Sequence, residues 1–267
     1  MFNNVLFIGC GNMGSILLGK FIANNSFSHQ QIRVVKPSLN NQIQGISYHQ
    51  NFSQLPNNYK ADIIFICIKP QNSEIILKEL SQTKIFDEDT IFVSTLAGKK
   101  INFFLKIFSK KTKIIRIMPN ILIHEDQGII PYYNSKTISI NEDRFFQNLF
   151  KNFAIYFAIS DEKSFHIFTA IFASGPAYIF LIAEILVNIA TTQKIENNLA
   201  INLVQKLIYG SALSLNGSNN FKNLRDKVTS PKGTTASAID RLTKNNSLHK
   251  LLQNAISQAV KTSKKLS

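Results

Sequence analysis

Three glycines near the start of the chain constrain the fold more than any other feature. Gly9, Gly11 and Gly14 form a G-x-G-x-x-G pattern between an apolar run, Val5–Ile8, and an apolar segment with helical spacing. In a dinucleotide-binding turn, the first glycine permits a tight turn and the second lets the backbone approach a pyrophosphate, while the third lets the helix pack against the strand. The pattern therefore predicts a strand–turn–helix unit that binds a dinucleotide. The residues expected to contact it are Ile8, Gly9, Cys10, Gly11, Asn12, Met13 and Gly14.

Apolar runs and helical segments alternate through the first part of the chain. The runs are short and rich in β-branched side chains, which is typical of strands that are buried on both faces of a sheet. This alternation predicts an α/β fold, with a Rossmann-type, doubly wound parallel sheet and right-handed crossovers. Strands are expected at 5–8, 32–35, 63–68, 91–94 and 114–118, with further strand-like runs at 128–133 and 154–159. Helices are expected at 13–23, 73–80, 101–108 and 143–150.

After Ser160 the pattern becomes entirely helical. Helices are expected at 162–173, 177–191, 199–215 and 248–264, and no convincing strand follows. The change predicts two domains, a dinucleotide-binding Rossmann domain at 1–160 and an all-α domain at 161–267. The second domain is rich in Phe, Leu and Ile, and a single small core cannot enclose so many large apolar side chains. We therefore expect it to form a homodimer.

One apolar run approaches the length of a membrane span. Residues 167–183 carry no charged side chain, whereas a membrane-spanning helix needs about 20 apolar residues. Ser174-Gly175-Pro176 interrupts the run, and Glu184 follows it directly. A helix buried in a core or in a subunit interface is the preferred interpretation, and we expect no membrane association.

The end of the second expected strand indicates which dinucleotide is bound. Enzymes that use NAD usually place Asp or Glu there, to hold the ribose 2′-hydroxyl. Here the strand ends in Val35 and Lys36, and Pro37 and Ser38 follow. Lys36 and the Ser38 hydroxyl would bind a 2′-phosphate, which a carboxylate would repel. The alternative is a solvated lysine in a turn. We predict NADPH as the cofactor, with NADH less favoured.

A loop of small residues precedes a helix start in the last part of the chain. It reads Ser230-Pro231-Lys232-Gly233-Thr234-Thr235. Its hydroxyls and free backbone N–H groups lie at the positive end of a helix dipole, which suits a carboxylate. Taken alone, the loop is equally well explained as an ordinary helix start.

Together these segments resemble the Δ1-pyrroline-5-carboxylate reductase family over nearly the whole chain. The resemblance is carried by the glycine turn, by the loop at 230–235 and by four segments between them, which read Ile68-Lys69-Pro70-Gln71, Thr95-Leu96-Ala97-Gly98, Arg116-Ile117-Met118-Pro119-Asn120 and Ala173-Ser174-Gly175-Pro176-Ala177-Tyr178. It implies hydride transfer from NADPH to the cyclic imine of 1-pyrroline-5-carboxylate, which yields L-proline in the last step of proline biosynthesis. It also implies a homodimer built through the C-terminal helices, and larger rings in many members.

The resemblance implies roles for particular residues. Ser230 and the amides near Thr234 and Thr235 would hold the substrate carboxylate, and the Thr235 hydroxyl would bond to the ring nitrogen. Asn120 would orient the substrate or the cofactor carboxamide. The expected catalytic residues are Thr235, Ser230 and Asn120. The expected substrate contacts are Met118, Ser174, Gly175, Pro176, Ser230, Gly233, Thr234 and Thr235. The other expected cofactor contacts are Lys36, Ser38, Ile68, Lys69, Pro70, Gln71, Ala97 and Gly98.

Several positions depart from the family pattern. Lys232 replaces a glycine of the substrate loop, and it costs roughly 1 kcal/mol if that position needs positive φ. Ile121 and Leu122 stand where the family usually has Thr-Pro, and Ala173 replaces a common glycine.

The chain is strongly basic, with a formal net charge of +14. Residues 221–267 hold ten Lys or Arg and only two acids, Asp226 and Asp240. A basic surface can attract nucleic acid, but no recognition-helix pattern or zinc-ligand spacing accompanies it. The charge equally suits small anionic ligands, so we predict neither a nucleic-acid partner nor a metal site. The two cysteines, Cys10 and Cys67, are too few for a disulfide framework, which favours the cytoplasm.

Three alternative functions stay open. A β-hydroxyacid dehydrogenase has a similar plan, but it places a catalytic lysine on the first long helix of its second domain, and 164–193 contains no Lys or Arg. An imine reductase with another substrate uses nearly the same chemistry. A catalytically degenerate paralogue would bind NADP(H) without turnover, and the departures at Lys232 and Ile121 are compatible with it.

Overall fold

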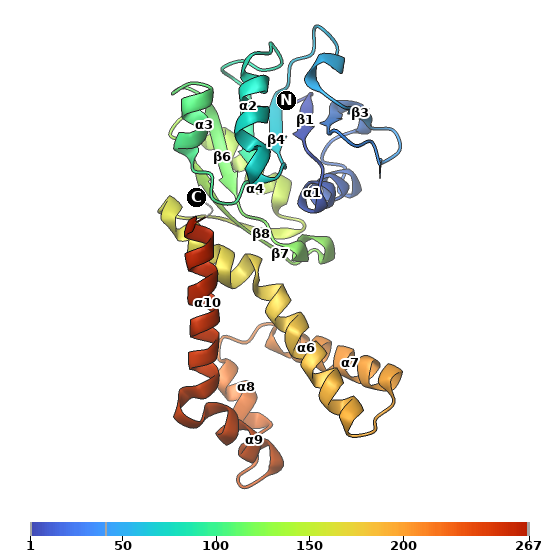
Figure 1. Ribbon diagram of the computed structural model, residues 1–267, viewed down its shortest axis with the longest axis vertical. Coiled ribbons are helices and arrows are strands. Elements are labelled where there is room, and N and C mark those ends of the chain that lie inside the picture. The colour runs from blue at the N-terminus through green and yellow to red at the C-terminus, as the bar shows by residue number, and fades with distance from the viewer. Residues whose placement is uncertain (1, 41, 266–267) are drawn as a thin grey trace. The chain divides into compact units, whose positions relative to one another are not determined.

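The structure, a computed structural model, describes residues 2–40 and 42–265 (Figure 1). These residues fall into two compact units. The first unit runs up to Ala173 and includes the end of the chain from Ala259, and the second is Ser174–Gln258. The domain boundary expected at residue 160 stays a prediction; the last strand of the sheet ends at Ala158.

The first unit is built on an eight-stranded sheet with the strand order β3-β2-β1-β4-β5-β6-β7-β8. The central strands are apolar and fully buried, which confirms the expected α/β class. The expected parallel pairing holds from β3 to β6. The strands are β1 Val5–Ile8, β2 Ile32–Val35, β3 Ser47–His49, β4 Ile63–Ile66, β5 Ile91–Ser94, β6 Lys113–Ile117, β7 Gly128–Asn134 and β8 Ala154–Ala158.

One pair of strands departs from the parallel order. β7 runs antiparallel to β6, with Ile117 opposite Tyr132, and β8 is parallel to β7. The connection between β6 and β7 is short and contains only a 3-10 turn, η4 (Ile121–Glu125). A crossover between parallel strands needs a dozen or more residues, so this connection returns the chain as an antiparallel neighbour.

Helices cover both faces of the sheet, because alternate strand residues point to opposite faces. Val5 and Phe7 pack in a core with α1 (Asn12–Ala23) and α4 (Ile140–Phe150). Leu6 and Ile8 pack in a second core with α2 (Ser73–Ser81) and α3 (Ile101–Ile107). This doubly wound arrangement places every helix start that follows β1, β4 and β5 at the carboxyl edge of the sheet (Figure 1), the edge where such folds bind ligands.

The segment after β8 completes the first unit. It contains η5 (Glu162–Ser164), α5 (Phe165–Phe168) and a π-helical turn, η6 (Thr169–Ala173). Phe165 packs in a third small core with Met118 and Ile159. The end of α10 (Ser247–Lys265) lies against this segment, where His166 Nδ1 and Ser263 Oγ are 2.9 Å apart.

The second unit contains helices only. α6 (Gly175–Thr192) and α7 (Asn197–Leu215) pack on each other. Two shorter helices, α8 (Phe221–Lys227) and α9 (Thr234–Thr243), lead through η7 (Lys244–Asn246) into α10. Within the described residues of α6 and α7, Pro176, Ala200 and Val204 are the buried side chains. Most large apolar side chains of this hairpin are therefore exposed in the single chain.

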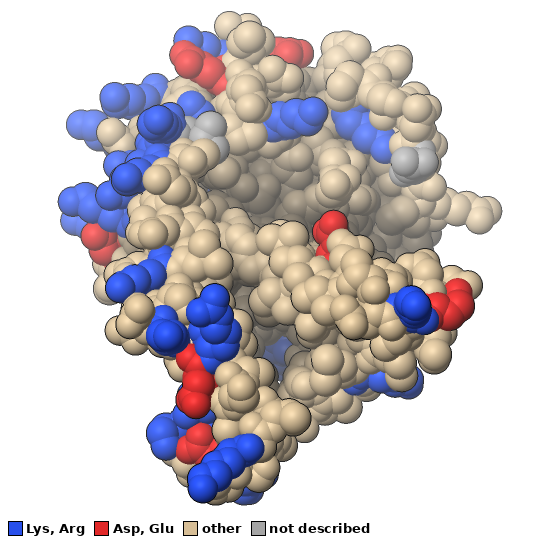
Figure 2. All heavy atoms as spheres, turned by 60° about the horizontal axis from the view of Figure 1, so that its bottom comes forward, with Lys and Arg blue, Asp and Glu red and all other residues tan. Residues whose placement is uncertain are grey.

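The apolar segment that leads into α6 passes the length and composition test for a membrane-spanning helix. An 18-residue window within Glu162–Thr192 has a mean hydropathy of 1.9, and 11% of that window is buried within the chain. One such helix is weak evidence for a membrane protein. Figure 2 shows wide areas without Lys, Arg, Asp or Glu, and many large apolar side chains of α6 and α7 are exposed, which also suits a subunit interface.

Candidate active site

The glycine turn after β1 has the geometry that its sequence predicts. Gly9 has φ +77°, and a Cβ there would lie 2.6 Å from Ile68 Cγ2 and 2.8 Å from the Cys67 carbonyl oxygen. A Cβ at Gly14 would lie 2.9 Å from Cys67 Cβ, so this glycine lets α1 approach β4. A Cβ at Gly11 would meet nothing within 4 Å, which leaves its backbone open to a ligand.

The start of α1 offers backbone donors beside this turn. Gly11 is the N-cap and gives no side-chain cap, and the first helical bond runs from the Ser15 N–H to the Gly11 oxygen. The N–H groups of Asn12, Met13 and Gly14 therefore lack carbonyl partners within the helix. Free N–H groups at the positive end of a helix dipole form an anion site, which fits a pyrophosphate.

Lys36 lies at the carboxyl end of β2 and is largely buried. Its Nζ donates to the Asn40 carbonyl oxygen at 2.6 Å and lies 4.9 Å from the centre of the Tyr48 ring. Ser38 is exposed, and its Oγ accepts from the Asn40 N–H at 3.5 Å. These contacts hold the Lys36 ammonium group beside the end of β2, and its role at a 2′-phosphate stays a prediction.

A small cavity joins the ends of three strands beside Lys36. Its volume is about 170 Å³. Gly9 follows β1, Lys36 and Pro37 follow β2, and Ile68 follows β4, so the cavity collects residues that the sequence assigns to one cofactor. Burial raises the pKa of the neighbouring Cys10 thiol, and the Lys36 charge partly opposes that rise. The Cys10 thiol is therefore protonated near neutral pH.

The ends of β4 and β5 place further expected cofactor residues at the same edge of the sheet. Lys69 and Gln71 are exposed on either side of Pro70, which begins the 3-10 turn η3 (Pro70–Asn72) after β4. Gly98 has φ +79° in the loop after β5. Ala97 packs with Met118 at the third small core, so an expected cofactor residue and an expected substrate residue lie together.

Asn120 is almost completely buried and makes two backbone contacts. Its Nδ2 donates to the Phe172 carbonyl oxygen at 3.1 Å, and its Oδ1 accepts from the Ile129 N–H at 3.1 Å. The side chain thus connects the end of β6 to β7 and to η6. Its expected role beside the nicotinamide stays a prediction, and these contacts show how the side chain is held in place.

An ion pair that the sequence did not reveal supports this region. Arg116 on β6 is buried, and its Nη1 lies 2.9 Å from Glu162 Oε1. The same oxygen accepts from the Ile101 N–H at 2.7 Å, and the guanidinium lies 4.3 Å from the centre of the Phe165 ring. Burial lowers the pKa of Arg116, and Glu162 opposes the shift. The pair connects β6, the start of α3 and the segment after β8.

The expected substrate loop lies in the second unit and forms a tight turn before α9. The Gly233 N–H donates to the Ser230 carbonyl oxygen at 3.0 Å, and Lys232 has φ +60°. With Pro231 at the second position and positive φ at the third, the turn is type II. A Cβ at Gly233 would collide with Ser230 Oγ and lie 3.1 Å from the Ser230 carbonyl oxygen, so a side chain there would displace the Ser230 hydroxyl.

The start of α9 also carries free backbone donors. Gly233 is its N-cap without a side-chain cap, and the first helical bond runs from the Ser237 N–H to the Gly233 oxygen. The N–H groups of Thr234 and Thr235 therefore lack helical partners. Within the second unit, the turn thus brings the Ser230 hydroxyl close to free amides, as a carboxylate site requires.

Replacing Lys232 by glycine should stabilise the protein. The left-handed region costs a non-glycine residue about 1–2 kcal/mol, which glycine would not incur. Glycine also raises the conformational entropy of the unfolded chain, and this offsets part of the gain in stability. We expect a net gain of about 0.5–1 kcal/mol, seen as a higher urea midpoint at fixed protein concentration.

The matched control for this prediction is Lys244→Gly. Lys244 is exposed but has φ −52°, so glycine there should lower the urea midpoint. A lower midpoint for Lys232→Gly as well would show that the positive φ at Lys232 stores no strain.

Comparison with known proteins identifies the family of the chain. Residues 162–266 match the model described as pyrroline-5-carboxylate reductase dimerisation, and residues 4–98 match the model described as NADP oxidoreductase coenzyme F420-dependent. The Arabidopsis thaliana pyrroline-5-carboxylate reductase is 30% identical over 98% of this chain and 94% of its own length. The Escherichia coli enzyme is 29% identical over 98% and 97%.

Solved structures agree with this assignment. Plasmodium falciparum pyrroline carboxylate reductase with NADP bound superposes with a TM-score of 0.87 at 26% identity, covering 98% of this chain and 97% of that one. The Coxiella burnetii pyrroline-5-carboxylate reductase gives a TM-score of 0.84 at 28% identity, covering 100% and 99%. With full-length relatives at this identity and the expected glycine turn in place, the chain belongs to the pyrroline-5-carboxylate reductase family.

Proposed function

We propose that this protein is an NADPH-dependent pyrroline-5-carboxylate reductase, which reduces the cyclic imine of 1-pyrroline-5-carboxylate to L-proline. The observation that carries the proposal is the match of the whole chain to reductases of that name, one of them solved with NADP. The glycine turn and the cavity beside Lys36 supply the local support.

The residues present fit NADPH. Bound there, the cofactor supplies the hydride. The open backbone at Gly11 and the free N–H groups of Asn12 and Met13 would hold its pyrophosphate, and Lys36 with Ser38 would hold its 2′-phosphate. Its nicotinamide end would lie against Ala97 and Gly98. Among the described residues, the end of β2 carries Lys36 where NAD enzymes place a carboxylate, and the carboxylate that lines the neighbouring cavity, Glu79, comes from α2.

The substrate site is assigned to the turn before α9 and to the end of β6. Ser230 and the amides of Thr234 and Thr235 would grip the carboxylate, and the Thr235 hydroxyl would hydrogen-bond to the ring nitrogen. Asn120 would orient the reacting groups. The remaining contacts are assigned to Met118, Ser174, Gly175, Pro176 and Gly233. A protonated imine is already electrophilic, so these residues act mainly by alignment and by excluding water.

The protein acts as a homodimer in this proposal. The dimerisation model of the family covers residues 162–266, and the exposed apolar side chains of α6 and α7 give a surface for the contact. We assign the enzyme to the cytoplasm, where free Cys10 and Cys67 stay reduced. A further association of dimers into rings is compatible with the same assignment.

The decisive experiment measures NADPH oxidation when pyrroline-5-carboxylate is added to the purified protein, with NADH in parallel. Formation of proline, faster with NADPH, is expected. Tight NADPH binding without turnover would replace the proposal by the degenerate paralogue. Turnover of other cyclic imines at much higher kcat/KM would replace it by an imine reductase of different specificity.

Replacing Lys36 by aspartate should weaken NADPH much more than NADH. A hydrogen bond to a charged group contributes about 1.5–3 kcal/mol, which corresponds to a loss of about tenfold to a hundredfold in NADPH affinity. NADH lacks the 2′-phosphate, so its affinity should change little. Titration of both cofactors by fluorescence measures the two values.

Two further variants separate recognition from folding. Lys36→Met keeps an apolar stem over Tyr48 and should show the same selective loss, whereas Lys110→Asp, at an exposed turn, should leave both affinities unchanged. An unaltered ratio of NADPH to NADH affinity in both Lys36 variants would remove Lys36 from the 2′-phosphate site.

A further inference from the structure

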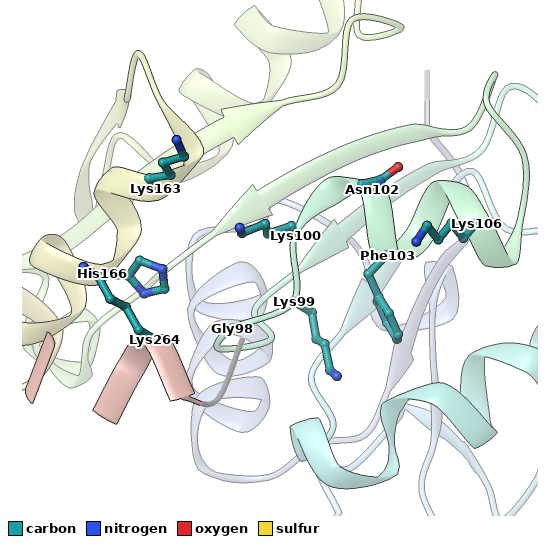
Figure 3. Close-up of a pocket in the computed structure, with 9 residues that line it drawn as sticks. All are labelled: Gly98, Lys99, Lys100, Asn102, Phe103, Lys106, Lys163, His166 and Lys264. Atoms are coloured by element: carbon teal, nitrogen blue, oxygen red, sulfur yellow. The ribbon is translucent and has the colours of Figure 1, made fainter. Parts of the chain in front are cut away.

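A second cavity lies in the first unit, between the start of α3 and the segment after β8 (Figure 3). Its volume is about 720 Å³, which lies in the range of small-molecule sites. Four segments that are distant in sequence line it: the loop after β5, one side of α3, the turn from η5 to α5, and the end of α10. The lining residues are Gly98, Lys99, Lys100, Asn102, Phe103, Lys106, Lys163, His166 and Lys264.

The lining is cationic. It contains five lysines, and in the part of the chain that the structure describes it includes no carboxylate. Figure 3 shows Lys100 extending toward His166, with Lys163 and Lys264 on that side of the cavity.

Two carboxylates outside the lining, Glu162 and Glu74, are engaged with other groups. Glu162 Oε1 accepts from Arg116 Nη1 and from the Ile101 N–H. Glu74, whose pKa Lys99 helps to lower, pairs with Lys78 at 2.8 Å. Glu74 therefore offsets only part of the charge of Lys99, and the lining of the cavity itself contributes no carboxylate.

The pKa of His166 is lowered by burial and by the positive charges around it. Burial lowers its pKa, and the charges of Arg116, Lys264 and Lys100 lower it further. Its ring is therefore neutral near pH 7, and Nδ1 is 2.9 Å from Ser263 Oγ. A neutral ring leaves a hydrogen-bonding group among the lysines without adding a further charge.

The lining chemistry favours phosphate groups. Lysine is a mobile point charge with three donors, and it suits a chain of phosphates, whereas planar carboxylates are usually gripped by the fork of arginine. The helix end adds little, because the N–H of Ile101, the first residue of α3, already donates to Glu162. Phe103 gives the cavity one aromatic wall, with Lys99 Nζ 4.8 Å from its ring centre.

We propose that the cavity lined by Lys99, Lys100, Lys106, Lys163 and Lys264 is a binding site for a polyphosphate group, separate from the cofactor phosphates. Lys36, assigned to the 2′-phosphate, follows β2, whereas this cavity follows β5, and two strands lie between them in the sheet. Gly98 borders both sites, so an anion bound here lies next to the assigned nicotinamide end.

The test is calorimetric titration of the full-length protein with inorganic tripolyphosphate and, separately, with ATP, each with and without NADP⁺. Lys100→Ala/Lys264→Ala should weaken tripolyphosphate at least tenfold. The matched control, Lys110→Ala/Lys111→Ala, removes the same charge from an exposed turn outside the cavity and should bind as the unaltered protein does. Equal melting temperatures of the two double variants establish that both are folded.

The outcomes show whether the site exists and whether it binds a phosphate chain alone or a nucleotide. Equal affinities for tripolyphosphate and ATP assign the site to the phosphate chain alone. Tighter ATP binding that Phe103→Ala abolishes assigns it to a nucleotide. Equal losses in the cavity and control variants, or no loss in either, overturn the proposal. The readout is heat of binding and needs no turnover, so failure here is distinct from failure of the reductase activity.

Discussion

Replacing Thr235 by alanine should lower kcat about a hundredfold or more while NADPH affinity stays within about twofold of the original. The Thr235 side chain lies at the second position of α9, and within residues 2–40 and 42–265 no hydrogen bond engages its hydroxyl, which is therefore available to the ring nitrogen. Loss of a preorganised hydrogen bond to the reacting group typically costs about 10²–10³ in kcat. Steady-state kinetics with pyrroline-5-carboxylate, together with a fluorescence titration of NADPH, measures both quantities.

Two variants in the same helix control for folding. Thr235→Ser keeps a hydroxyl and should recover most of the rate. Thr243→Ala removes a hydroxyl that donates to the Ile239 carbonyl at 2.8 Å, and it should leave kcat nearly unchanged. An equal loss of turnover and of NADPH affinity in Thr235→Ala would show that this loop does not hold the substrate.

The sheet was predictable wherever its strands are continuous apolar runs. The bounds expected for β1, β2 and β5 are those observed, because burial on both faces demands apolar residues at every position. β3, Ser47–His49, was missed: it has three residues, and half-exposed polar side chains occupy an edge. Its strand state depends on pairing with β2, which the local sequence does not encode.

The helical part was predictable in its long members only. The expected helix at 199–215 corresponds to α7, Asn197–Leu215. The expected helix at 162–173 is instead a succession of η5, α5 and η6, with a π-helical turn at its end. α8 was missed, because its seven largely polar residues carry no apolar period.

The candidate site divides in the same way. The roles of Gly9, Gly11 and Gly14 can be predicted from their spacing alone, since each role depends on the absence of a side chain. Lys232 gives no such signal, because a lysine rarely adopts positive φ and only the turn around it imposes the value. Glu162 was missed because its partners, Arg116 and the Ile101 N–H, are distant in sequence.

The exposed apolar side chains of the second unit support the proposed homodimer. Phe180 on α6 is 60% exposed and Leu207 on α7 is 55% exposed, and many of their apolar neighbours are similarly open. Burial of one such side chain contributes about 1.5–3 kcal/mol. A surface with so many of them is stable in water only when another apolar surface covers it, and the dimerisation model of the family covers this same segment.

Changing Phe180 and Leu207 together to glutamate should therefore convert the dimer into monomers and abolish turnover. Two uncompensated charges in an apolar interface cost more than the apolar contacts that they replace. Light scattering coupled to size-exclusion chromatography measures the mass, at the protein concentration of the kinetic assay.

The control, Ile75→Glu/Ile140→Glu, also replaces two exposed apolar side chains by glutamate, but in the first unit, where these isoleucines are 74% and 75% exposed. That control should stay dimeric and active, because α2 and α4 carry these residues as isolated apolar side chains. A dimer that survives the change on α6 and α7, or one that the control also dissociates, would place the subunit contact elsewhere.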